Sequence, residues 1–314
     1  MANSFQHILV YGIGGVGGYF GGLLAHGINT GPAGGTQVHF IARGEHLKAI
    51  QEKGLTLKTA DGQTRRCIPN TASDDPTPLP MVDLVLLCVK GYDLPGALDS
   101  IREKVTPSTV ILSLMNGVDV ADRVQRQLDR GIILPTCVYV SSRISAPGEV
   151  TQMGPAGRIL TGNRTGRRDL YPEDLLMLAL KAGWNVEWLE KPEEAVWKKY
   201  LFIAPFALVT ASRSLTIGGV LKDPEARQEL LAVMDEVMAV SASQGTPLSE
   251  EVREATLQTA ASFPEETKTS FQRDVESGRS QNERDLLGDT LVRFGREGGV
   301  PTPVIEKILG ILEK

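Results

Sequence analysis

The chain has 314 residues, of which 41% are hydrophobic and 23% are charged, so it is long and apolar enough to form two globular cores. A formal net charge of −5 excludes a general nucleic-acid-binding surface and a polybasic membrane surface, because both need an excess of Lys and Arg. Cys67, Cys88 and Cys137 lie far apart and partly in apolar runs, which predicts buried thiols rather than a disulfide framework or a metal site. With no basic leader and no apolar run long enough for a bilayer, we expect a cytoplasmic protein.

Residues 8–18, ILVYGIGGVGG, place three glycines at the spacing G-x-G-x-x-G between an apolar, strand-like run and a helix-compatible stretch at 19–25. Gly12 permits a sharp turn, Gly14 lets the backbone approach a pyrophosphate, and Gly17 lets the helix pack closely on the strand. The helix N-terminus adds free N–H groups for the phosphates. The alternative is a glycine-rich turn of an ordinary α/β domain. We predict a dinucleotide site that includes Gly12, Ile13, Gly14, Gly15, Val16 and Gly17.

The rest of the first half alternates short apolar runs with polar or helical stretches. Such near-continuous apolar strands are typical of a parallel sheet that is covered by helices on both faces. Residues 59–80 are rich in Pro, Asp, Thr and Ser, so we expect an irregular or hairpin insertion there. The expected strands after the glycine loop are residues 37–42, 84–89, 109–114 and 132–140.

The second half is dominated by helical patterns, which predict an all-helical domain. A change from alternating strands and helices to consecutive helices marks a domain boundary, which we place near residue 190. The two predicted domains are therefore residues 1–190 and 191–314. Gly245 and Gly298 are expected to follow directly after helix ends. The expected helices are residues 193–209, 225–244, 250–262 and 285–297.

The end of the second strand, in the segment IARGEH, bears on which nicotinamide dinucleotide binds. NAD sites usually carry Asp or Glu there, whereas this chain has Arg43, with Glu45 already beyond the strand. A guanidinium binds a 2′-phosphate through charge-assisted contacts of about 1.5–3 kcal/mol each, and an acid would repel it. Arg43 therefore favours NADPH, the alternative being a solvated charge at a strand end. Residues 28–36 explain the long spacing from Gly12 as a lengthened loop.

Several motifs in order along the chain resemble the 2-dehydropantoate 2-reductase, or ketopantoate reductase, family. They are GIGGVGGYFGGLLA, IARGEHL, LCVKGYD, LMNGV, WKKY, TSFQRDVESGR and GREGGVPTP, and they span nearly the whole sequence. The resemblance implies a Rossmann-type α/β domain followed by an all-α domain like the C-terminal domain of 6-phosphogluconate dehydrogenase. It also implies NADPH as cofactor.

Lys90 and Asn116 each follow a predicted parallel strand, at the end where open α/β sheets bind ligands. The family resemblance implies that both face the nicotinamide ribose. The alternatives are a solvated lysine at a strand end and a simple Asn-Gly turn.

Hydride reduction of a ketone needs a proton for the developing alkoxide, and a lysine can supply it if burial lowers its pKa. In WKKY, Lys198 lies four residues after Glu194, which is the spacing of a surface ion pair. Lys199 instead opens a stretch without charged residues that runs to residue 209, and it matches the family motif W-x-K. We expect Lys199 to be the general acid and to bind the substrate.

Four further positions bear on how the substrate and the cofactor bind. Ser270 of TSFQRD is the expected ligand of the substrate carboxylate, with a helix cap as its alternative. Ile203 and Ala207 stand where the family has substrate-binding asparagines, so the substrate of this chain is open to change. The family's cofactor-side glutamate corresponds to Asn282, with Glu283 adjacent.

The sequence thus predicts NADPH-dependent reduction of 2-dehydropantoate to pantoate, in pantothenate and coenzyme A biosynthesis. One alternative is reduction of a different small 2-oxo acid or ketone. Another is a non-catalytic NADPH sensor, which the two lysines disfavour because a sensor needs no proton donor. Apolar helix faces serve a core or a homodimer interface equally well, so the oligomeric state stays open.

Overall fold

The computed structural model describes residues 5–30, 35–170, 172–278 and 281–313. The chain forms two compact units, of which the first contains Met1–Met115 and Val120–Pro192. The second contains Asn116–Asp119 and Glu193–Lys314. Of the lengthened loop expected at 28–36, residues 28–30 instead form the end of helix α1 (Gly15–Thr30), and residues 31–34 lie outside the described residues.

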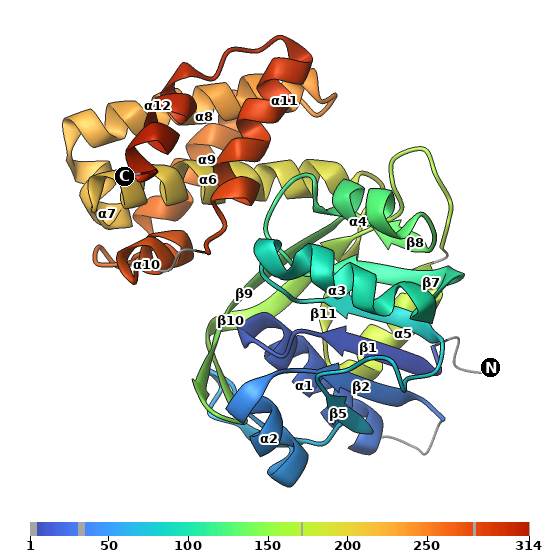
Figure 1. The fold of residues 1–314 in the computed structure, drawn as a ribbon. Coiled ribbons are helices and arrows are strands. Elements are labelled where there is room, and N and C mark those ends of the chain that lie inside the picture. The colour runs from blue at the N-terminus through green and yellow to red at the C-terminus, as the bar shows by residue number, and fades with distance from the viewer. Residues whose placement is uncertain (1–4, 31–34, 171, 279–280, 314) are drawn as a thin grey trace. The chain divides into compact units, whose positions relative to one another are not determined.

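The first unit is built on a six-stranded parallel sheet, as the continuous apolar runs predict. Helices α3 (Leu94–Ile101) and α4 (Val120–Leu128) lie on one face, and α1 (Gly15–Thr30) lies on the other (Figure 1). Side chains such as Leu84 and Leu86 are fully buried between these layers. In sheet order the strands are β5 (Thr71–Ser73), β2 (Gln37–Ile41), β1 (His7–Tyr11), β6 (Val82–Leu87), β7 (Val105–Ser113) and β8 (Ile132–Leu134).

A second sheet of five strands packs on the other side of α1, which therefore lies between two sheets. This explains the glycines of α1, since a Cβ on Gly21 would stand 2.9 Å from the Val10 side chain, and one on Gly18 would stand 2.5 Å from Val150. The strands are β11 (Asn185–Trp188), β10 (Glu149–Thr161), β3 (Leu55–Lys58) and β4 (Thr64–Cys67), with β9 (Thr136–Ala146) antiparallel to β10. Helices α2 (Gly44–Lys53) and α5 (Pro172–Ala182) and the short 3-10 turns η1 (Gly91–Asp93) and η2 (Arg102–Lys104) complete the unit.

One further sequence expectation for this unit needs correction. The run 132–140 is not one strand, because Pro135 separates β8 of the parallel sheet from β9 of the second sheet. Proline cannot donate to a strand ladder, which makes it a natural point for the chain to change sheets. For the segment 59–80, the hairpin alternative agrees with the structure, since β4 pairs antiparallel with β3, and β5 joins the edge of the parallel sheet.

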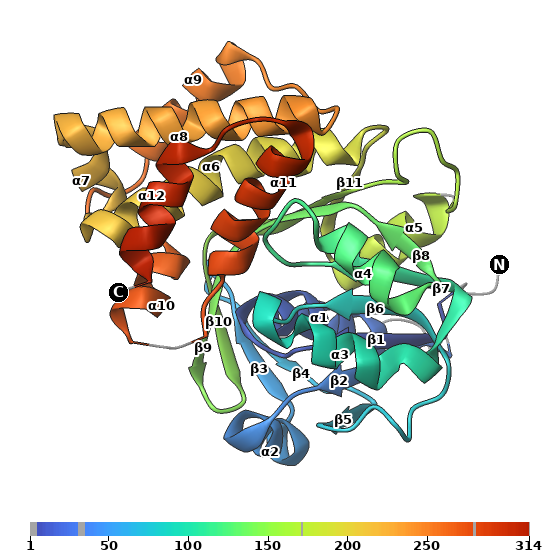
Figure 2. The ribbon, with the colours of Figure 1, turned by 45° about the horizontal axis from the view of Figure 1, so that its top comes forward.

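The second unit is helical, and none of its described residues forms a strand. Figure 2 shows α8 as a long helix with α11 and α12 packed on it. The helix expected at 285–297 opens with a π-helical turn, η3, and it ends at Gly298 rather than before it, because Gly299 takes the left-handed position with φ +67°. The helices are α6 (Pro192–Arg213), α7 (Ile217–Lys222), α8 (Pro224–Ser243), α9 (Glu250–Ala261), α10 (Ser270–Glu276), η3 (Asp285–Asp289), α11 (Thr290–Gly298) and α12 (Pro303–Leu312).

Membrane-spanning helices were sought over the described residues, and none of the helices there has the length and apolar character to cross a bilayer.

Candidate functional site

The loop between β1 and α1 owes its glycines to close backbone contacts. Gly12 has φ +94°, and a Cβ there would stand 2.8 Å from the carbonyl oxygen of Cys88. A Cβ on Gly17 would stand 2.0 Å from the carbonyl oxygen of Gly12, so helix and loop could not approach each other with a larger residue. Beside Gly14, by contrast, the space is open to 4 Å. The loop is tight on its protein side and open on the other, as a phosphate cradle requires.

A cavity of about 400 Å³ lies beside this loop. Its walls include Gly12, Ile13 and Gly14 of the loop, Arg43 after β2 and Lys90 after β6. These segments meet because β2, β1 and β6 are neighbours in the sheet and their carboxyl ends share one edge. Of the other residues expected at the cofactor, Gly15, Val16 and Gly17 lie in the first turn of α1, and Asn116 and Asn282 belong to the second unit.

Arg43 stands at the N-cap position of α2, at the edge of the cavity, with 76% of its side chain exposed. Its Nη2 forms an ion pair of 3.0 Å with Asp93 of η1. Glu45, the acid nearest in sequence, pairs instead with Lys48 at 2.7 Å. The structure therefore brings to the arginine an acid that sequence reasoning missed. The only available signal was the position of Asp93 just after a strand end, in VKGYD.

His46 of α2 is a second residue of the cavity wall that the sequence did not single out. Its Nδ1 accepts a hydrogen bond of 3.0 Å from the backbone N–H of Gly148, in the turn between β9 and β10. Burial lowers the pKa of His46 from its ordinary value, with the opposing effect of nearby backbone groups at Ala146 and Ile13. The neutral ring therefore ties α2 to the second sheet beside the cavity.

Lys199 and Asn116, which are 83 residues apart in the sequence, meet in the second unit. Lys199 Nζ donates a hydrogen bond of 2.9 Å to Asn116 Oδ1. Lys199 is half-buried on α6, whereas the neighbouring Lys198 is half-exposed and lies 3.9 Å from Glu194. The two lysines thus differ as their sequence spacing indicates. Lys198 is directed to an ion pair at the surface, and Lys199 is directed to a polar partner within the unit.

Trp197 and Tyr200 fix the orientation of this part of α6. Both are buried, their rings meet edge to face at 5.8 Å, and the Tyr200 hydroxyl donates to the carbonyl oxygen of Leu286 at 2.6 Å. Because these neighbours in sequence are anchored in the core, the rotation of α6 about its axis is set, and with it the direction of Lys199.

The remaining predicted residues occupy varied environments in the second unit. Ala207 is 3% exposed and packs in the hydrophobic core, while Ile203 is half-buried against that core. Ser270 is the exposed first residue of α10, and the helix is capped by the side chain of Thr269 instead. The Asn282 side chain accepts a hydrogen bond of 3.0 Å from the backbone N–H of Arg284.

Glu283, next to Asn282, is only 4% exposed. The two neighbours therefore have different environments. The Asn282 side chain is hydrogen-bonded to the local backbone, whereas the carboxyl group of Glu283 is buried. The functional roles of Ser270, Ile203, Ala207 and Asn282 stay predictions.

Comparison with known proteins covers nearly the whole chain. The model of "Ketopantoate reductase PanE/ApbA" matches residues 8–166, and the model of its C-terminal domain matches residues 192–314. The 2-dehydropantoate 2-reductase of Halobacterium salinarum is 26% identical over 308 residues, which cover 98% of each chain. The crystal structure of a PanE/ApbA family ketopantoate reductase from Ralstonia eutropha JMP134 matches with a TM-score of 0.85 at 28% identity, over 98% of this chain and 97% of that one.

The ternary structure of D-mandelate dehydrogenase with NADH and anilino(oxo)acetate also matches, with a TM-score of 0.85 over 98% of this chain and 97% of that one. At 20% identity, this likeness shows the fold alone. The two family models match most of the residues of both units, and the relatives match from end to end. The chain therefore belongs to the ketopantoate reductase PanE/ApbA family, and it is an oxidoreductase that reduces a 2-keto acid.

Proposed function

We propose that the protein reduces 2-dehydropantoate to pantoate with NADPH, a step of pantothenate biosynthesis. The observation that carries this proposal is the hydrogen bond of 2.9 Å between Lys199 Nζ and Asn116 Oδ1. This hydrogen bond joins Lys199, which the sequence favours as the proton donor, to Asn116, which the sequence favours as a residue at the nicotinamide ribose. In this proposal, residues 1–190 bind the cofactor, and residues 191–314 bind the substrate and supply the acid.

The first unit has features that fit a phosphorylated dinucleotide. Open space beside Gly14 leaves room for a pyrophosphate at the N-terminus of α1, and Arg43 offers a guanidinium at the end of β2. When bound there, the reduced nicotinamide supplies the hydride for the keto carbon. Arg43 would hold the 2′-phosphate in place of the carboxylate of Asp93, because the phosphate carries a greater charge of about −1.5 to −2.

The residues of the second unit handle the proton and the substrate. Lys199 gives a proton to the carbonyl oxygen as negative charge develops on it, which prevents accumulation of an alkoxide. Asn116 accepts a hydrogen bond from Lys199, so the remaining N–H bonds of the ammonium group have restricted directions. Ser270, whose hydroxyl is not needed as a helix cap, binds the substrate carboxylate.

The test is turnover by the purified protein with a panel of 2-oxo acids, followed by the absorbance of the reduced cofactor. We expect 2-dehydropantoate to be reduced with a higher kcat/KM than 2-oxo acids of similar size that lack its hydroxyl. Lys199→Ala should lose this activity and Lys198→Ala should keep it. No reduction of 2-dehydropantoate under conditions where another member of the panel is turned over would refute the proposed substrate.

A second candidate is a 2-oxo acid with an apolar tail. It is favoured by the half-buried side chain of Ile203, whereas its neighbour on the same helix face, Ala207, is packed in the core and offers little surface. With Lys199 they form one helical stripe at i, i+4 and i+8, and both are apolar where the family resemblance implies asparagines. The anilino(oxo)acetate in the structure of the mandelate dehydrogenase neighbour is a 2-oxo acid with an aromatic group, and mandelate itself is a 2-hydroxy acid with an aromatic group. Preferred turnover of aryl or branched 2-oxo acids would support this candidate.

A further inference from the structure

The short segment Asn116–Asp119 belongs to the second unit, although the residues before and after it belong to the first. It forms neither a helix nor a strand, so no ladder of backbone hydrogen bonds fixes its place. Gly117, with φ +124°, gives it a sharp bend. Its position therefore depends on what its side chains contact in the second unit.

Asp119 is the most deeply buried of these side chains, with none of its surface exposed. Its Oδ2 lies 2.5 Å from Arg293 Nη2 and 3.5 Å from Thr290 Oγ1, and both partners come from α11. Burying a carboxylate is costly unless a charge or hydrogen-bond donor compensates it. The contacts with Arg293 and Thr290 therefore compensate the burial of this carboxylate against α11.

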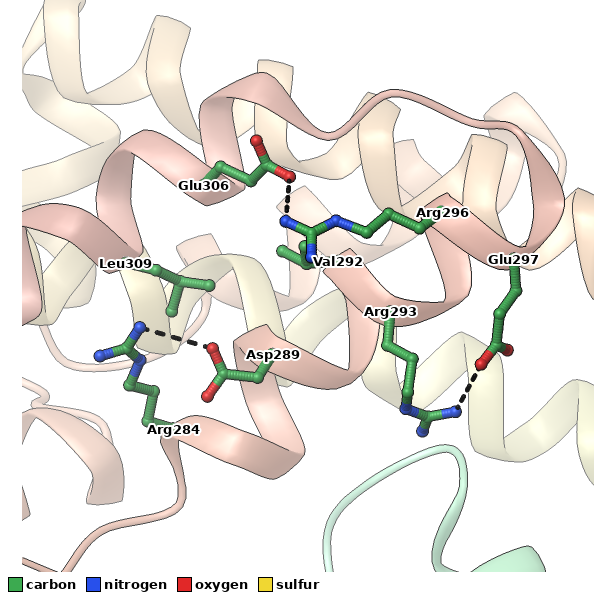
Figure 3. A pocket seen from close by; sticks show the side chains of 8 residues that line it. All are labelled: Arg284, Asp289, Val292, Arg293, Arg296, Glu297, Glu306 and Leu309. Carbon is green, nitrogen blue, oxygen red and sulfur yellow. Dashed lines mark hydrogen bonds and ion pairs between the residues drawn. The ribbon is translucent and has the colours of Figure 1, made fainter.

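Arg293 is held from several sides. Its guanidinium lies 4.5 Å from the centre of the Phe294 ring, and its Nη1 is 3.4 Å from Glu297. Arg293 lines a pocket of about 600 Å³. Figure 3 shows it there together with Arg284 and Arg296. Arg284 pairs there with Asp289 and Arg296 with Glu306, so the pocket balances its own charges. Arg293 additionally reaches out of this pocket to Asp119.

We propose that the Asp119–Arg293 ion pair positions Asn116 for the reaction. Asn116 lies three residues before Asp119, and its Oδ1 accepts the hydrogen bond from Lys199. If Asp119 leaves α11, the bent segment shifts and Asn116 moves away from the ammonium group. The pair acts through Asn116, so Asp119 and Arg293 are positioning residues. The proposal rests on the proposed role of Lys199 as proton donor.

The first experiment compares Arg293→Gln with Arg296→Gln, a matched variant that removes a guanidinium from the same helix and pocket. We expect Arg293→Gln to lower kcat by about 10- to 100-fold, the scale of a misplaced catalytic group, and to leave the KM for NADPH within about twofold. Arg293→Lys, which keeps the charge, should recover most of the loss. Arg296→Gln should behave as the wild type.

The pH profile separates positioning from general damage. Asn116 Oδ1 favours the charged form of Lys199, so its displacement should lower the pKa of that lysine and move the alkaline limb of the kcat profile to lower pH. Titration of Lys199 by NMR of labelled lysine side chains should show the same shift without any substrate. This readout stays informative if 2-dehydropantoate is not the substrate, so failure of the proposed function and failure of this inference can be distinguished.

Asp119→Asn provides a second route, because it removes the charge and keeps the shape of the side chain. The same lowered kcat and the same shifted titration in Asp119→Asn would support the proposal. An unchanged titration of Lys199 in folded Arg293→Gln or Asp119→Asn would overturn it. The proposal would also be overturned if the variants lost activity only when they also lost their cooperative unfolding transition. The ion pair would then be purely structural.

Discussion

The ion pair between Arg43 and Asp93 makes the cofactor preference testable by two substitutions with opposite expected effects. Arg43 has 76% of its side chain exposed and contacts Asp93 at 3.0 Å. An exposed pair of this kind contributes only about 0.2–1 kcal/mol, whereas charge-assisted hydrogen bonds to a phosphate contribute about 1.5–3 kcal/mol each. If NADPH binds as proposed, we expect the exchange of Asp93 for its 2′-phosphate to be favourable even with one such bond.

Arg43→Ala should raise the KM for NADPH by about tenfold or more, which corresponds to about 1.4 kcal/mol of lost binding, with little effect on NADH. Asp93→Asn should have the opposite effect, because the competing carboxylate is gone and Arg43 stays available. The KM for NADPH should fall by about 1.4- to 5-fold, which corresponds to the strength of the exposed ion pair that is removed.

The assay is the initial rate against the concentration of each cofactor, at a saturating 2-oxo acid and constant ionic strength, since exposed charges are screened by salt. Glu45→Gln is the matched control, because Glu45 is an acid at the start of α2 that pairs with Lys48. Equal rises in KM for NADPH and NADH in Arg43→Ala would refute the assignment of the 2′-phosphate site. A higher KM for NADPH in Asp93→Asn would refute the competition between carboxylate and phosphate.

Three further predictions concern the acid, the substrate and pH. Lys199→Ala should lower kcat by about 10²- to 10⁴-fold, whereas Lys198→Ala should stay near the wild type in the same assay. If the natural substrate lacks the hydroxyl of 2-dehydropantoate, Ile203→Asn should shift kcat/KM toward 2-dehydropantoate by about tenfold, and an unchanged ratio would contradict this. Burial, and secondly the charge of His7, lowers the pKa of His39 from 6.5 to about 4. As the pH falls, His39 is therefore protonated at a higher pH in the unfolded chain than in the folded one. The free energy of unfolding should fall by about 3 kcal/mol as the pH is lowered from 6.5 to 4. Denaturant titrations of His39→Gln should lack that part of the pH dependence.

The parallel sheet of the first unit could be predicted because its strands are buried on both faces and are therefore continuous apolar runs. The second sheet could not be predicted in this way. Residues of β9 beyond Val138 are mostly exposed or half-exposed, and their pattern neither alternates cleanly nor stays apolar. The pairing of β10 with β3 joins segments about ninety residues apart, so no local turn signal marks it. The glycines of α1, which allow the second sheet to pack closely on this helix, were the one local sequence signal of that sheet.

The glycine loop, the strand ends and the different environments of the two lysines could be predicted from the sequence, because each depends on neighbours within one turn or one strand. Their polar partners were not accessible. Asp93 meets Arg43 across 50 residues, and Asp119 meets Arg293 across 174. Nothing in the local pattern of either acid distinguishes it from a solvated charge.

This difference has a consequence for which properties of the enzyme the sequence can predict. A parallel sheet gathers the ends of its strands at one edge, so the residue types there indicate the class of cofactor and reaction without knowledge of their contacts. Selectivity between cofactors, the pKa of an acid and the choice of substrate depend instead on contacts made by those residues, such as Asp93 at Arg43 and Asn116 at Lys199. The family is therefore clear at 26% identity, whereas the substrate is decided by substitutions at the partners of the groups that we propose to be catalytic.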